Sequence, residues 1–139
     1  MHCLIRVFVL LVIGSMGVTN IHGAESNAQE IPDQIMSALA KGDAKEISKH
    51  FHSSVQLILL DSEGMYNREQ AEQILRIFFS QHQPTDFTVR HEGGSLTKDS
   101  RFIIGILRTG KGIYRVSLFL KIIDGNLSIH QLRIEEDNV

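Results

Sequence analysis

Two histidines, His50 and His52, flank Phe51 at a spacing that could serve chemistry. In an extended chain, side chains two positions apart point to the same side, so both imidazoles could reach one metal ion. A metal site needs at least a third ligand, and the spacing places none. The further histidines that could be recruited are His82, His91 and His130. We therefore expect no metal, and histidines where a helix ends are typical of capping or surface groups.

Two glycine-containing patterns resemble phosphate-binding loops but lack the required context. Residues 109–112 read Thr-Gly-Lys-Gly, whereas a phosphate loop needs G-x-x-x-x-G-K-[ST] between a strand and a helix. The pair Gly93-Gly94 is likewise followed by no predicted helix. Both patterns indicate turns between strands. Ser62, Ser95 and Ser117 have no histidine and aspartate placed beside them, so serine hydrolysis is not indicated.

The composition indicates an ordinary globular chain. Its 139 residues suffice for one domain, and the balance of apolar and charged residues excludes a disordered, collagen-like or disulfide-scaffold protein. Fourteen Lys and Arg residues stand against sixteen Asp and Glu residues. Because the net charge is slightly negative, a general electrostatic grip on nucleic acid is excluded.

The first 24 residues have a composition of their own. Arg6 precedes the apolar run Val7–Ile13, which is shorter than the roughly 20 residues that span a bilayer as a helix. This pattern predicts a secretory signal peptide over residues 1–24 and a flexible lead-in over 25–30; the alternative is an uncleaved membrane anchor. We expect export to the bacterial periplasm or exterior, with no stable membrane span after cleavage. The only cysteine, Cys3, would be removed with the leader.

The next segment predicts two short helices and a strand. Proline at a first helical position forfeits a donor that would be unpaired anyway, so a helix begins near Pro32 and ends at Gly42. Asp43 caps a second helix that runs toward His50. Residues 55–60 are apolar and partly β-branched, which predicts a strand, and residues 61–64 read as a turn.

The longest predicted helix covers about residues 68–81. Asn67 and Gln70 form a capping-box pattern at its start, and Pro84 prevents its continuation. Apolar residues recur at helical spacing on one face, namely Ala71, Ile74, Leu75, Phe78 and Phe79. This face is expected to pack on a sheet.

The C-terminal half predicts an antiparallel sheet. The strands are expected over 87–92, 101–109, 113–123 and 127–135. Asp124-Gly125 lies between the last two and is a strong hairpin signal, because both residues tolerate positive φ. The order of elements predicts an α+β fold, with N-terminal helices and one long helix packed on a curved, mainly antiparallel sheet.

A two-residue turn at Asp124-Gly125 predicts the register of this hairpin. It pairs Leu120 with Ile129, Leu118 with Gln131 and Val116 with Arg133. Strict alternation then gives an inner face of Tyr114, Val116, Leu118, Leu120, Ile122, Leu127, Ile129, Gln131 and Arg133. The outer face is Arg115, Ser117, Phe119, Lys121, Ser128, His130 and Leu132.

Several stretches resemble an uncharacterised bacterial family of exported proteins, a domain of unknown function within the nuclear-transport-factor-2-like (cystatin-like cone) superfamily. They are Ile31-Pro32 with Ala38 to Asp43, Gly64 to Asn67 with Gln70-Ala71, Phe78-Phe79, and Gly112 to Val116. The resemblance covers about residues 30–136, and we expect one cone-type domain over 31–136. Because that family has no established activity, the resemblance implies fold and export and transfers no catalytic residue.

The resemblance also implies a pocket between sheet and helix. Its expected lining is Tyr66, Phe79, Tyr114, Leu118, Gln131 and Arg133. Enzymes of the superfamily that resemble ketosteroid isomerases or polyketide cyclases place a carboxylate base in such a pocket. Here the acids fall mostly at turns or surfaces, so we expect no catalytic residue and no cofactor, and a small apolar molecule as ligand.

The outer face of the sheet is the second candidate site. Arg115, Phe119, His130 and Leu132 mix apolar and charged groups as protein interfaces do. The resemblance implies that this face can form a homodimer. Three hypotheses therefore stay open: a non-catalytic domain that binds a small apolar molecule or an envelope protein, an isomerase- or cyclase-like enzyme, and a filled cone that acts only through its outer sheet face.

Overall fold

The structure, a computed structural model, describes residues 31–95 and 99–138. The predicted signal peptide and lead-in lie outside these residues. The helices are α1 (Asp33–Lys41), α2 (Ala44–Ser48) and α3 (Arg68–Gln81), and the strands are β1 (Phe51–Leu59), β2 (Ser62–Asn67), β3 (Pro84–Ser95), β4 (Ser100–Thr109), β5 (Gly112–Ile123) and β6 (Asn126–Glu136). None of the helices described here is long and apolar enough to cross a membrane.

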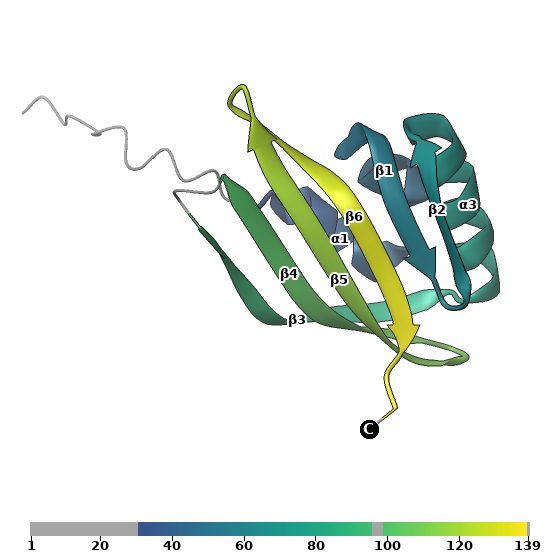
Figure 1. The fold of residues 1–139 in the computed structure, drawn as a ribbon. Helices are drawn as coiled ribbons and strands as arrows, with labels where there is room; N and C mark the ends of the chain where they lie inside the picture. Colours follow the sequence, from purple (N-terminus) through teal and green to yellow (C-terminus); the bar gives the residue numbers. More distant parts are fainter. Residues whose placement is uncertain (1–30, 96–98, 139) are drawn as a thin grey trace, which may run out of the picture.

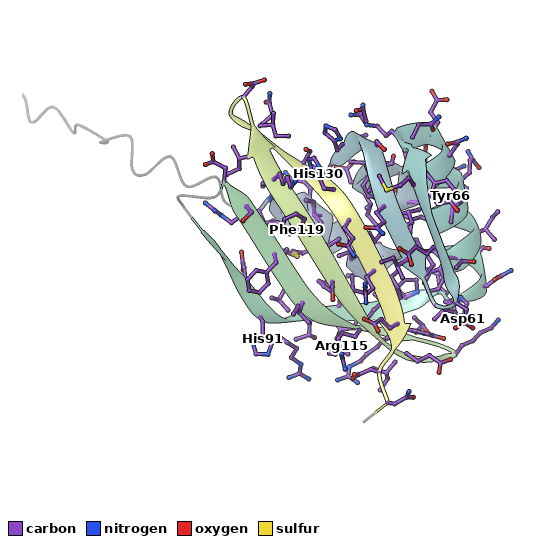
Figure 2. The ribbon with its side chains drawn as sticks, viewed as in Figure 1. Asp61, Tyr66, His91, Arg115, Phe119 and His130 are labelled. Atoms are coloured by element: carbon purple, nitrogen blue, oxygen red, sulfur yellow. The ribbon has the colours of Figure 1, made fainter. Side chains whose placement is uncertain are left out.

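The strands form one curved sheet in the order β2-β1-β6-β5-β4-β3, in which only the β1–β6 pairing is parallel. The helices lie on one face of this sheet (Figure 1). The other face, here called the outer face, carries side chains such as Phe119 and Arg115 (Figure 2). The predicted fold class is confirmed.

Strand β2 departs from the sequence prediction, which placed a turn over residues 61–64. The chain reverses earlier, at Leu60 and Asp61, and Leu60 adopts the left-handed conformation with φ 54°. Its amide donates a 2.8 Å hydrogen bond to the Ile134 carbonyl of β6. Ser62–Asn67 then pairs antiparallel with β1 and forms one edge of the sheet.

The helix ends follow the predicted local signals. Gly42 closes α1 at φ 69°, and the Asp43 side chain accepts a hydrogen bond from the Glu46 amide at the start of α2. At the start of α3, Asn67 accepts from the Gln70 amide at 2.8 Å while the Gln70 side chain accepts from the Asn67 amide at 3.2 Å. The predicted capping box is confirmed.

Replacing Asn67 by alanine is expected to lower the free energy of unfolding by about 1 kcal/mol, because the Gln70 amide in the first turn of α3 loses its side-chain acceptor. Equilibrium urea unfolding measures this loss. Asn67→Ser retains an acceptor for the Gln70 amide and should recover most of it. A loss from Asn67→Ser as large as that from Asn67→Ala would show that the capping hydrogen bond is not the cause.

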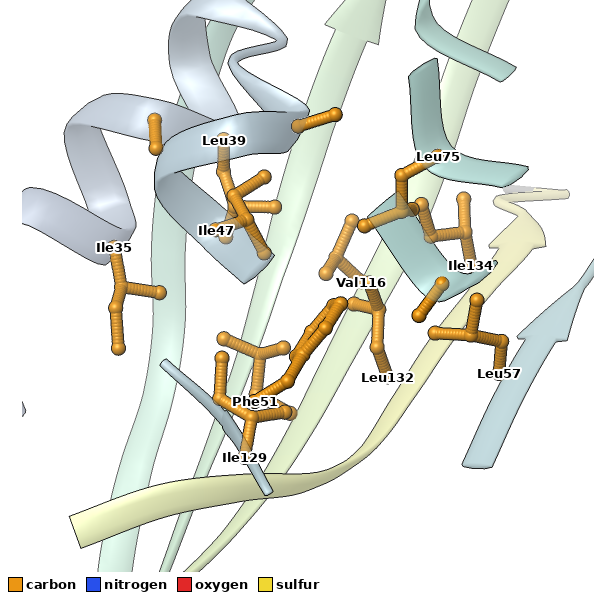
Figure 3. Packing of buried hydrophobic residues seen from close by; sticks show 14 of the residues in the cluster. Ile35, Leu39, Ile47, Phe51, Leu57, Leu75, Val116, Ile129, Leu132 and Ile134 are labelled. Atoms are coloured by element: carbon orange, nitrogen blue, oxygen red, sulfur yellow. The ribbon is translucent and has the colours of Figure 1, made fainter. Parts of the chain in front are cut away.

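The core fills the space between the helices and the inner face of the sheet (Figure 3). Leu39 and Ile47 enter it from the N-terminal helices, Leu75 enters from α3, and Phe51 and Val116 enter from strands. All five side chains are at most 1% exposed. The inner face is therefore apolar and closely packed, as in a protein interior without room for solvent.

The predicted β5–β6 register is wrong beyond Leu120. Leu120 pairs with Ile129 as expected, but Phe119 pairs with Gln131 and Leu118 with Leu132, because His130 is an extra residue on β6. Such a β-bulge reverses the face of every later side chain on its strand. Leu132 and Ile134 are consequently buried in the core, where Figure 3 shows them.

Candidate functional site

The structure does not bring the six predicted pocket residues together. Phe79, Tyr114 and Leu118 are buried within the core and present at most 5% of their surface. Tyr66 lies on edge strand β2, partly buried against the same core. The bulge places Gln131 and Arg133 on the outer face, opposite the predicted side. The predicted inner face is therefore wrong at these two positions.

Carboxylates are also absent from the described interior. Ser48 is the only polar or charged residue among residues 31–94 and 99–138 that is buried. The register of β3 shifts between Val89 and His91, so Glu92 need not share a face with Arg90. Glu92 pairs with Ile103 of β4, which is buried. Glu92 is nevertheless exposed. The arrangement seen here offers no buried acid that could act as a base in an apolar pocket.

Two hollows of the surface lie away from the predicted pocket. One of about 410 Å³ lies beside α1 and α2 and is lined mainly by polar side chains, including Asp33, Gln34, Lys41 and Glu46. Another of about 340 Å³ lies where the β1–β2 turn meets the end of β6, between Leu60, Asp61 and Glu135. Neither contains any of the six predicted pocket residues, but a smaller hollow of about 200 Å³, beside the end of β6, is lined by Tyr114 with Lys111 and Asp137.

The outer face presents the predicted interface residues with one correction. Arg115, Phe119 and His130 lie there (Figure 2), whereas Leu132 is fully buried on the other side. Phe119 is 37% exposed and pairs across the strands with Phe102 of β4, which is 42% exposed. Sequence reasoning missed Phe102, although its alternation with Ile103 and Leu107 on β4 could have indicated it.

Charged groups surround this pair of aromatic side chains. On β5, the Lys121 ammonium lies 5.7 Å from the centre of the Phe119 ring, and Arg115 pairs with Asp137 at 3.2 Å. On β6, Arg133 and Glu135 approach to 3.7 Å. The exposed Arg133–Glu135 pair contributes little to stability, but these charges set the pattern that a partner meets.

Two histidines stack at the edge of the outer face. The rings of His52 on β1 and His130 on β6 lie 4.2 Å apart at 22°. Burial lowers the pKa of His130, and the nearby His52 and Lys121 lower it further because they disfavour a second positive charge. The neutral form of His130 is thus favoured in the fold.

The other histidines have separate structural roles. His82 stacks on Phe78 with ring centres 4.4 Å apart and lies edge-on to Tyr114. Its Nδ1–H donates to the Phe78 carbonyl at 3.0 Å and so caps the end of α3. His50 lies 3.7 Å from Glu46. Within the described residues no three His, Cys, Asp or Glu groups could hold a metal ion together.

The comparison with protein families decides what kind of chain this is. Residues 32–135 match a family described as a domain of unknown function, DUF4783. The chain belongs to this family. The predicted resemblance to an uncharacterised bacterial family is therefore confirmed, and no curated protein matches the chain.

Solved structures agree with this assignment. The chain is 32% identical to a DUF4783 protein from Bacteroides ovatus, with TM-score 0.75 over 80% of this chain and 99% of that one. A DUF4783 protein from Bacteroides uniformis is 31% identical, with TM-score 0.74 over 79% and 100% of the two chains. A cystatin-like domain of unknown function from Nostoc punctiforme shares the fold, at 10% identity and TM-score 0.61 over 77% and 73%.

Proposed function

We propose that this DUF4783 protein is an exported, non-catalytic binding domain that pairs with a second copy of itself through the outer face of its sheet. The observation that carries the proposal is the contrast between the two faces. The inner face is filled by core side chains, whereas the outer face exposes Phe102 of β4 and Phe119 of β5 side by side. A ligand would find little accessible surface inside, so binding is expected on the outside.

The size of the outer face is suitable for a dimer. Six strands are separated by five gaps of about 4.8 Å and average about ten residues, or about 33 Å, so the sheet covers about 800 Å². A stable protein interface buries about 800 Å² on each partner. Sheets that pack face to face in this way interdigitate apolar side chains, which Phe102 and Phe119 would supply.

The outer face carries charges of both signs around its phenylalanine pair. Glu63 on β2 and Glu135 on β6 are acidic, while Arg115 and Lys121 on β5 and Arg133 on β6 are basic. A two-fold axis near Phe119 would place Phe119 of each copy against Phe119 of the other. Contact of one patch with its own copy is what an isologous interface requires.

Replacing Phe119 by aspartate tests this proposal. The variant puts a charge at the centre of the apolar contact, so we expect the dimer dissociation constant to rise at least about thirty-fold. Analytical ultracentrifugation of residues 25–139 measures it. Ile77→Asp is the matched control, because Ile77 is 59% exposed on α3, on the helical side of the sheet.

The two variants are expected to differ in their effect on dimerisation. Ile77→Asp should leave the dimer intact, and circular dichroism should show both variants folded. A wild-type protein that stays monomeric at millimolar concentration would refute the dimer. Weakening of equal size by both variants would show that the contact lies elsewhere than the outer face.

A further inference from the structure

The stacked histidines lie where two neighbouring strands are both irregular. On β1, Phe51 pairs with Ile129 and the next pairing joins Gln56 to Gln131. Residues 52–55 of β1 therefore stand opposite His130 alone, the same residue that forms the bulge against β5. His52 and Ser53 also precede the register of β1 with β2, which begins at Ser54. The stack thus occupies a place where ladder hydrogen bonds are missing.

Local contacts show that the two imidazole rings help to join the start of β1 to β6. The His130 Nε2 and the Ser128 hydroxyl lie 3.3 Å apart, and the His52 Nδ1 lies within 3.4 Å of the Ser54 amide. Just before the gap, the Ile129 amide donates to the His50 carbonyl at 2.7 Å. The start of β1 is therefore joined to β6 by the pairing at Ile129 and then by the two imidazole rings.

The charged groups around the stack are cationic. Lys121 of β5 faces His130, and the Arg68 guanidinium of α3 donates to the Phe51 carbonyl, one residue before His52. The carboxylate of Glu46 lies near His50 rather than near the stacked rings. Among the described residues, neither His52 nor His130 forms an ion pair with a carboxylate. Protonation of His130 would consequently place an uncompensated positive charge against the His52 ring and near Lys121.

We infer that the His52–His130 stack is a pH-sensitive latch, which holds the start of β1 on β6 while His130 is neutral and releases it when His130 becomes charged. The direction in which stability changes with pH follows from the pKa of His130. Its folded-state pKa lies below the ordinary value of 6.5, so the folded protein binds fewer protons than the unfolded chain in this range. The stability contributed by the latch is present above pH 6.5 and is lost as the pH falls below it.

A consequence follows for the outer face, and this part alone depends on the proposed function. Gln131, which follows His130 in the bulge, pairs with Phe119 at the centre of the proposed contact. Release of the bulge would therefore weaken the dimer in acid.

Amide hydrogen exchange of Ile129 tests the latch directly, because its hydrogen bond to His50 closes the strand beside the stack. Between pH 7.5 and pH 5, the protection factor of the Ile129 amide should fall at least about tenfold, relative to the amide of Leu118 in the core. In His130→Phe, an aromatic ring remains at the bulge but cannot ionise, so the fall should be about twofold or less. His91→Asn removes an exposed histidine of β3 and should behave like wild type.

The results that would overturn the latch are specific. A wild-type protection factor at Ile129 that changes no more than that of Leu118 would refute it, even if His130→Phe failed to fold. An equal acid response in wild type and a folded His130→Phe would also refute it. Repeating the exchange in Phe119→Asp separates the two proposals, since the latch should respond to acid in a monomer as it does in a dimer.

Discussion

Leu132→Ala is expected to lower the free energy of unfolding by about 3 kcal/mol, because it removes a fully buried side chain and leaves a cavity in the core. Leu132 pairs with Leu118 of β5, which is also buried, so both strands lose contacts. Equilibrium denaturation in urea measures the change. The effect should appear as a lower transition midpoint with little change in slope.

The neighbouring substitution Gln131→Ala is the matched control. Gln131 lies on the outer face, only partly buried, and its loss should change stability by no more than about 0.5 kcal/mol. Simple alternation without the bulge would exchange the two residues between the faces and reverse this order. A larger cost for Gln131→Ala than for Leu132→Ala would therefore contradict the bulge at His130.

Gly105→Ala is expected to cost about 2 kcal/mol of stability, because β4 has no room for a side chain there. A Cβ atom at Gly105 would lie 2.6 Å from the Phe87 ring atom Cε2 and 2.8 Å from the Thr88 carbonyl oxygen. The ring could turn aside, but the carbonyl belongs to the backbone of β3 and moves only with the strand. Thermal unfolding followed by circular dichroism measures the loss.

Gly110→Ala provides the control for this prediction. Gly110 lies in the turn before β5, and a Cβ atom there would meet nothing within 4 Å. Its substitution should leave the unfolding temperature within a degree or two of wild type. If Gly105→Ala were equally harmless, the close approach of Phe87 and Thr88 to β4 would be disproved.

Because the interior of this chain is filled, the outer face of the sheet is a better candidate for a binding site than a pocket between sheet and helices. A cone that holds a ligand needs accessible surface between sheet and helices, and here Phe79, Tyr114 and Leu118 present almost none. Among residues 31–94 and 99–138, the buried residues are apolar except for Ser48. The outer face, by contrast, keeps two phenylalanines in contact with water, which gives a partner something to bury.

The sequence by itself determined the elements that depend on nearby residues. Gly42, Asp43 and the Asn67–Gln70 capping box mark helix ends because each makes its hydrogen bonds within a few residues. The Asp124-Gly125 hairpin and the pairing of Leu120 with Ile129 are predictable for the same reason. Helical spacing likewise identified the buried face of α3 and hence the α+β class.

Only the tertiary structure decided which side of β6 faces the core beyond Ile129. The bulge at His130 depends on β5 on one side and β1 on the other, and β1 is about 70 residues away in the chain. Strand side chains alternate with a period of two, so one extra residue exchanges Gln131 and Arg133 with Leu132 and Ile134. Local sequence carries no record of that insertion, because it is the partner strands that accommodate it.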